Sequence, residues 1–195
     1  MTPLMLIAGL IELSTAFPYI RDVRNGKTHP AIVSWSTWFV LAAIAAMASF
    51  SEGVYASGAI LSALALECFL IIVFSVKKFH FAYTRFDVFC QLGALVGLFL
   101  WWWTDHPLFA LISFVVIDAV GSLPTFRHAW RMPREETLLT FSLAIVGNLV
   151  ALIAIPIYAI PEILVPAYLL VLNSMISITI IYRNRVKLAK ELLKF

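Results

Sequence analysis

Charged residues are scarce in this chain. They make up 13% of the 195 residues, whereas 62% of the residues are hydrophobic. A soluble globular domain is usually about 25% charged and about 45–50% apolar. The chain therefore has too little polar surface to cover a water-soluble globule, and we expect the lipid bilayer to be its solvent. Nucleic acid is not an expected partner, because the basic residues behind the net charge of +3 follow a membrane pattern.

Residues with catalytic or metal-binding potential are also few. The two cysteines, Cys68 and Cys90, lie in apolar stretches and are expected to be packing residues, not a disulfide. The sequence contains no His/Cys metal spacing and no Gly-x-Gly-Asp signature of intramembrane aspartyl proteases. The last apolar segment has no lysine for a retinal Schiff base. These absences disfavour an enzyme, a metal site, a bound cofactor and a photoreceptor.

Long apolar runs are what the sequence has in abundance. About 20 apolar residues cross a bilayer as a helix, and continuous runs without alternation indicate helices. The predicted spans are Leu4–Ile20, Ala31–Phe50, Val54–Val76, Phe86–Trp103, Leu108–Phe126, Thr137–Ile155 and Ile163–Tyr182. We expect the first run to be a mature span, not a signal peptide, because Glu12 interrupts it and no basic residue precedes it. The predicted fold is an all-α integral membrane protein with seven transmembrane helices.

The basic residues all fall on one side of these spans. The 14 lysines and arginines occur at 21–27, 77–85, 127–134 and 183–194. The opposite side has only the acidic residues Glu52, Asp105 and Glu162. The positive-inside rule predicts an outer N-terminus and a cytoplasmic C-terminus, in a multi-pass protein of the plasma (inner) membrane. The basic tail is expected at the inner surface, near anionic lipid.

A short motif occurs twice. FPYIR at Phe17 and LPTFR at Leu123 place Pro18 over Pro124 with an offset of 106 residues. The offset superposes the first three spans on the last three, and the single span between them makes the two repeats parallel. This 3+1+3 plan divides the chain into repeat 1–80, linker helix 81–106, repeat 107–182 and tail 183–195. A GxxxG pattern at Gly93 suits packing within the molecule or a homo-oligomer.

The same offset pairs polar residues in the middle of apolar helices. Glu12 falls on Asp118, and Glu67 falls on Asn173. A mid-bilayer carboxylate costs at least about 2.5 kcal/mol, so these groups need partners or an aqueous cavity. We expect a central site that binds a small-molecule solute or protons, with Asn148 and Trp38 lining it as well. Hydrogen-bonded structural contacts between helices are the alternative interpretation.

Pro18 and Pro124 are candidate hinges. Each proline removes a backbone donor and crowds the carbonyl four residues earlier. Both lie on the cytoplasmic side of the acids, so they are placed to gate the inner end of a cavity. A static kink remains the alternative.

The sequence resembles the SWEET and SemiSWEET sugar transporters and the wider PQ-loop family. Pro18 with its following basic residues, the Lys27-Thr28 turn, and Leu123–Arg127 carry the likeness, together with the 3+1+3 plan. The resemblance implies alternating access and gives Asn173 the position of a substrate-contacting asparagine. The Pro-Gln dipeptide is absent, and the first-repeat counterpart of Asn173 is the acid Glu67. These departures favour a cationic or zwitterionic solute, or proton coupling.

The sequence therefore predicts a small-solute transporter. A sugar uniporter of the SWEET type and a ligand or sorting receptor on the same fold are the alternatives. An intramembrane enzyme, in which paired carboxylates do acid–base work, is disfavoured by the missing signatures.

Overall fold

The computed structural model describes residues 2–28, 32–76 and 107–192, together with positions 85, 88, 89, 92, 99, 102 and 103. Within this part of the chain the structure is all-helical and contains no strand. The predicted linker helix, including Gly93 and Gly97, falls almost wholly outside the described residues, as does Cys90. The count of seven helices therefore rests on the sequence.

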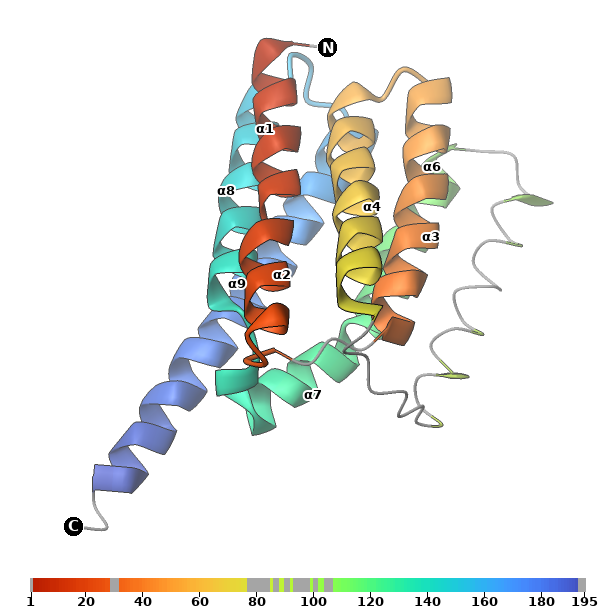
Figure 1. Ribbon diagram of the computed structural model, residues 1–195. Coiled ribbons are helices and arrows are strands. Elements are labelled where there is room, and N and C mark those ends of the chain that lie inside the picture. The colour runs from red at the N-terminus through yellow and green to blue at the C-terminus, as the bar shows by residue number, and fades with distance from the viewer. Residues whose placement is uncertain are drawn as a thin grey trace.

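The helices form a bundle (Figure 1). Their bounds are α1 Pro3–Ser14, α2 Ala16–Arg24, α3 Ile32–Ser51, α4 Tyr55–Ser75, α6 Pro107–Gly121, α7 Leu123–Arg131, α8 Leu138–Ala154 and α9 Ile160–Leu192, with a short 3-10 helix, η2, at Pro133–Glu135. The hydroxyl oxygen of Thr2 accepts a hydrogen bond from the backbone N–H of Met5, and Pro3 follows it, so α1 begins with a standard cap.

Three stretches are long and apolar enough to cross a membrane. They are Pro3–Arg24, Tyr55–Ser75 and Ile160–Ala189, and two shorter apolar helices run over Trp35–Ser51 and Leu138–Ala154. Large apolar side chains such as Leu10, Phe69 and Val171 are exposed on the outside of the bundle. A helical chain with such a surface is compatible with a membrane protein.

The helices fall into two matching sets. α3 begins at residue 32 and α8 at residue 138, which is 106 residues later, and α2 and α7 begin at 16 and 123. The packing contacts match as well: α1 packs on α4 as α6 packs on α9, and α1 packs on α8 as α6 packs on α3. α4 and α9 pack on each other. We call the set α1–α4 the first half and the set α6–α9 the second half.

The first helix of each half breaks near its proline. α1 gives way to α2 at Thr15, ahead of Pro18, and α6 gives way to α7 at Ser122, ahead of Pro124. The predicted continuous helix Leu108–Phe126 is therefore wrong, because α7 lies across the end of the bundle (Figure 1). Proline cannot donate to the carbonyl four residues earlier and its ring crowds that carbonyl, so the helix is interrupted there, although Thr15 and Ser122 keep helical backbone angles.

The last helix is longer than predicted. α9 continues past Tyr182 to Leu192, so residues 183–192 of the predicted tail are helical. The Arg183 Nε donates to the carbonyl of Trp130 at 2.8 Å, and the Lys187 Nζ donates to that of Arg131 at 2.7 Å. Basic side chains at the C-terminal carbonyls of α7 satisfy acceptors and suit the helix dipole. This contact holds α9 in its extended helical form.

Basic residues gather at the end of the bundle where α2 ends, α7 lies and α9 extends (Figure 1). This end, which we call the basic end, carries Arg21, Arg24, Arg127, Arg131, Arg183 and Lys187. The opposite end holds the start of α1 and the α3–α4 turn (Figure 1). Gly53 in that turn has φ +72°, a left-handed conformation that suits glycine.

At one end of the bundle a single apolar cluster contains residues of both halves, whereas at the other end each half has its own cluster. Toward the opposite end, one cluster joins all six long helices, with Ala8, Leu41, Ile60, Phe114, Ala151 and Val165 among its buried members. At the basic end, Val23, Trp35 and Ile71 form a cluster of the first half, whereas Ala129, Phe141 and Ile180 form one of the second half. Among the described residues, the buried apolar clusters therefore join the two halves toward the opposite end, and each half has its own cluster at the basic end.

Candidate functional site

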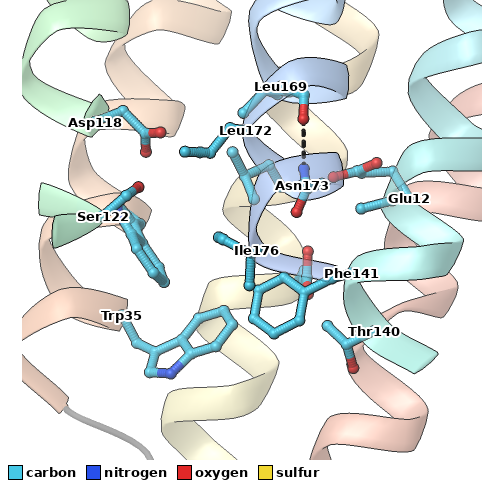
Figure 2. Close-up of a pocket in the computed structure, with 14 residues that line it drawn as sticks. Glu12, Trp35, Asp118, Ser122, Thr140, Phe141, Leu169, Leu172, Asn173 and Ile176 are labelled. Carbon is cyan, nitrogen blue, oxygen red and sulfur yellow. Dashed lines mark hydrogen bonds between the residues drawn. The ribbon is translucent and has the colours of Figure 1, made fainter. Parts of the chain in front are cut away.

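A cavity lies between the two halves, on the basic-end side of the shared core. It encloses about 50 Å³, which is room for a few water molecules. Its lining residues are Glu12, Trp35, Trp38, Leu64, Glu67, Asp118, Ser122, Thr140, Phe141, Ala144, Leu169, Leu172, Asn173 and Ile176 (Figure 2). Five of the six predicted site residues line it, and the sixth, Asn148, contacts one of them.

Glu12 reaches the cavity from α1. Its side chain is buried, and its Oε2 accepts a hydrogen bond of 3.2 Å from the Asn148 Nδ2 of α8. The same nitrogen donates to the carbonyl of Ala144 at 2.8 Å, which fixes the amide against its own helix. Gly147 allows this contact, since a Cβ there would lie 3.0 Å from the Glu12 Oε2. Asn148 thus donates a hydrogen bond to Glu12 from α8 and is not among the residues that line the cavity.

Asp118 reaches the cavity from α6. It is buried, and its Oδ2 accepts a hydrogen bond of 2.7 Å from the Tyr168 hydroxyl of α9. The Tyr168 ring packs edge-on against Phe114, with 6.5 Å between the ring centres. Sequence reasoning missed Tyr168, because its counterpart at the 106-residue offset is Ser62 and the repeat gives no signal for it.

Glu67 and Asn173 occupy matching places on the two central helices. Glu67 of α4 is buried and lines the cavity. The Asn173 Nδ2 of α9 donates to the carbonyl of Leu169 at 2.8 Å (Figure 2). One N–H of the Asn173 amide is used in this bond, so the side chain keeps a second N–H donor and its carbonyl acceptor. With the carboxylate of Glu67, this side of the cavity has several acceptor oxygens.

Aromatic side chains form the basic-end part of the lining. The Trp35 Nε1 donates to the Tyr19 hydroxyl at 3.2 Å, and the Trp35 and Trp38 rings meet edge-on at 5.1 Å. Phe141 of α8 stands at the position that matches Trp35 of α3. Trp38 therefore lies in the lining, as predicted, next to a second indole. Electron-rich ring faces attract cations.

Two further polar groups in the lining are buried. They are the Ser122 hydroxyl, at the break between α6 and α7, and the Trp38 Nε1 of α3. Sequence reasoning missed Ser122, although its position four residues after Asp118 places both on one helix face. Thr140 was missed too; its hydroxyl donates to the carbonyl of Thr15 at 3.1 Å, and no spacing in the sequence indicates this contact.

Three carboxyl groups from three helices line the cavity. Among the described residues of its lining there is no lysine, arginine or histidine. Within the residues that the structure describes, no cluster of metal-ligating side chains occurs. Such a site can hold a positively charged group by charge-assisted hydrogen bonds. The candidate hinges Pro18 and Pro124 lie beside the helix breaks.

At the basic end, polar contacts join the halves. The Thr28 and Thr137 hydroxyls are 2.8 Å apart, and the Thr137 hydroxyl donates to the Asp22 Oδ2 at 3.2 Å. At the opposite end, the Glu162 carboxylate accepts from the backbone N–H groups of Tyr55 at 3.1 Å and Ala56 at 2.8 Å. Both contacts connect the first half to the second.

Next to Thr137, a histidine sits between two acids. The His128 Nδ1 lies 2.7 Å from the Glu136 Oε1, and its Nε2 lies 3.2 Å from the Glu135 Oε2. The hydrogen bond with Glu136 is the main reason why the pKa of His128 lies above its ordinary value of 6.5. Burial raises the pKa of Glu136, against the opposing effect of His128. This cluster ties α7 to the connector that leads into α8.

Comparison with known proteins adds no relative. No family model, curated protein or solved structure matches this chain.

Proposed function

We propose that this protein is a membrane transporter that moves a small cationic or zwitterionic solute, or protons with it, by alternating access. The observation that carries the proposal is the convergence of Glu12, Glu67 and Asp118 on one cavity between two matching halves. Buried acids in membrane-spanning helices are costly, so they are placed where a substrate or ion pathway uses them.

The arrangement of the helices supports a multi-pass topology. We infer seven spans, with the segment 86–103 as the linker helix between two parallel repeats. The matching order and packing of α1–α4 and α6–α9 support two such repeats. By the positive-inside rule, the basic end faces the cytoplasm of a cell whose plasma (inner) membrane holds the protein.

The divided core suggests which way the cavity opens. A shared apolar cluster seals the halves at the opposite end, whereas at the basic end each half has a cluster of its own. When the halves separate, hydroxyl groups such as those of Thr28 and Thr137 can form hydrogen bonds with water in place of each other. Apolar side chains have no such replacement, so separating them costs more free energy. We infer that the cavity communicates with the basic end and that the breaks beside Pro18 and Pro124 let α2 and α7 move.

The chemistry of the lining separates this proposal from a sugar uniporter. The resemblance to SWEET and PQ-loop transporters fits the paired halves, the basic face and Asn173 in the cavity. Three acids in the lining exceed what a neutral solute needs. We therefore favour a charged solute.

The proposal is tested by binding and flux. Purified protein is screened by thermal shift with sugars, amino acids, amines and nucleosides at two pH values, and hits are followed by uptake into proteoliposomes. We expect stabilisation and flux with a cationic or zwitterionic solute, and loss of both in Glu12→Gln/Asp118→Asn. Glu52→Gln, a change at an exposed acid outside the cavity, serves as the matched control. Unchanged binding and flux in the double variant would overturn the proposal.

A further inference from the structure

The two acids at matching positions face the cavity from different sides. Glu12 belongs to the first half and Asp118 to the second, 106 residues apart. Figure 2 shows them separated by the α9 side chains Leu172 and Asn173. The approximate symmetry of the two halves thus gives the cavity two anionic ends.

Each end has more than one acceptor. Glu12 shares the cavity with Glu67, the acid of the neighbouring α4. Asp118 shares it with the Ser122 hydroxyl, which is fully buried and lies beside the carboxylate. An ammonium group brings three donors and a positive charge, which suits a carboxylate with a second oxygen beside it.

Between the two ends the lining is apolar. Leu64, Leu169, Leu172, Phe141 and Ile176 contribute hydrocarbon surface. Methylene groups are favourable against such a surface, whereas hydroxyl or carboxylate groups there would lose their hydration. The lining between the acids therefore favours a hydrocarbon chain over a polyhydroxylated one.

We propose that the cavity takes a linear aliphatic diamine, with one ammonium group at Glu12 and Glu67 and the other at Asp118 and Ser122. This inference rests on the proposed function and narrows its substrate class. A monoamine leaves one anionic end without a cation. An amino acid that spans the cavity would place its carboxylate next to Glu12 or Asp118, and the two negative charges would repel each other. A diamine also links the two halves, because each half supplies one of the end acids.

The experiment compares two ligands of the same shape. Butane-1,4-diamine and pentylamine differ only in one terminal group, which is ammonium in the first and methyl in the second. Binding to the full-length protein in detergent is measured by isothermal titration calorimetry. We expect the diamine to bind at least about tenfold more tightly, which is the usual value of one charge-assisted hydrogen bond.

Variants at the Asp118 end decide the assignment. Asp118→Asn should lower diamine affinity about tenfold or more and leave pentylamine affinity within about twofold. Ser122→Ala adds no bulk. It should also lower diamine affinity, by a smaller factor than Asp118→Asn does. Glu52→Gln is the control that should change neither affinity. Retained pentylamine binding shows that a variant is folded; if Asp118→Asn does not fold, Ser122→Ala decides.

The outcomes separate this inference from the proposed function. Equal binding of the two amines, or diamine binding unchanged in Asp118→Asn and Ser122→Ala, would overturn the diamine assignment and leave a transporter of another charged solute. If neither amine binds and no charged solute stabilises or crosses with the protein, the proposed function fails and the diamine assignment fails with it.

Discussion

At the scale of single residues, the site depends on close helix contacts that small side chains permit. Gly147 of α8 faces the backbone of α1, where a Cβ would lie 3.2 Å from the Glu12 nitrogen and 3.4 Å from the Ala8 oxygen. These neighbours are backbone atoms and cannot rotate away. The Glu12–Asn148 hydrogen bond therefore depends on a glycine one residue before the asparagine.

Gly147→Ala tests this dependence. We expect a loss of about 1–3 kcal/mol in the free energy of unfolding, because the added methyl group forces α1 and α8 apart. Thermal unfolding in detergent, followed by circular dichroism, measures the change. Gly9→Ala on α1 is the matched control: its nearest neighbour lies 3.6 Å away, so the variant should gain up to about 0.5–1 kcal/mol. Equal stability of the two variants would contradict the close contact.

The sequence predicts the acids better than their partners. Glu12, Glu67 and Asp118 are conspicuous because a charge in an apolar helix is costly, and they do reach one cavity. Tyr168 and Ser122 are ordinary residues of apolar helices, and their closeness to Asp118 follows from how α6 and α9 pack. Asn148 was expected in the lining, but it supports Glu12 from the neighbouring helix.

At the scale of helices, the contacts between the halves lie at helix ends. The start of α4 is capped by Glu162 from the other half, whose carboxylate accepts from two N–H groups that have no partner within α4.

The helix ends are also where sequence prediction fails. The proline rule indicates a break in each first helix, but not that α7 turns across the bundle or that α9 continues to Leu192.

Replacing Glu162 should loosen the end opposite to the basic end. We expect Glu162→Ala to lower the free energy of unfolding by about 0.5–2 kcal/mol, because α4 loses its cap and the favourable charge at its N-terminus. The shift in melting temperature measures it, with Glu52→Ala, an exposed acid at the same end, as the control. A shift no larger than that of the control would mean that the cap contributes nothing.

The His128 cluster should make the basic end sensitive to pH. The pKa of His128 lies above its ordinary value of 6.5, so its stabilisation is complete below 6.5 and is lost as the pH rises through the higher value. The raised pKa of Glu136 acts in the same direction, since its buried carboxyl favours the protonated form.

We therefore expect the melting temperature to fall between pH 6 and pH 9, and His128→Asn to flatten the part of the fall above pH 6.5. Thermal unfolding across this pH range measures both curves. An identical decline in the variant would show that other groups are responsible.

At the scale of the whole molecule, the proposed repeat has a counterpart in the arrangement of the described helices. The offset of 106 residues, first seen between two prolines, also relates α3 to α8 and the packing of each half. The division of the core at one end was not predictable. The division reflects which apolar helix faces are in contact in this conformation. The same residues could form different contacts in a second conformation, and the sequence does not indicate which set is observed.

The inferred orientation can be tested with an impermeant maleimide. Lys27→Cys and Glu52→Cys place thiols at two exposed positions at the two ends of the bundle, in a background with Cys68→Ala and Cys90→Ala. In intact cells only the thiol at position 52 should react, and in inverted vesicles only the thiol at position 27. Labelling of both from one side would contradict the topology.

The polar contacts between the halves also bear on how such a molecule can be divided or duplicated. Glu12 takes its amide donor from α8, and α4 takes its cap from the start of α9, so in both contacts the second half completes the first. A pair of identical first halves would place Ala42 where Asn148 stands and would have no Tyr168. The two halves have become complementary and are no longer interchangeable: fragments cut within the linker should reassemble as an unlike pair, and neither should form a working dimer with itself.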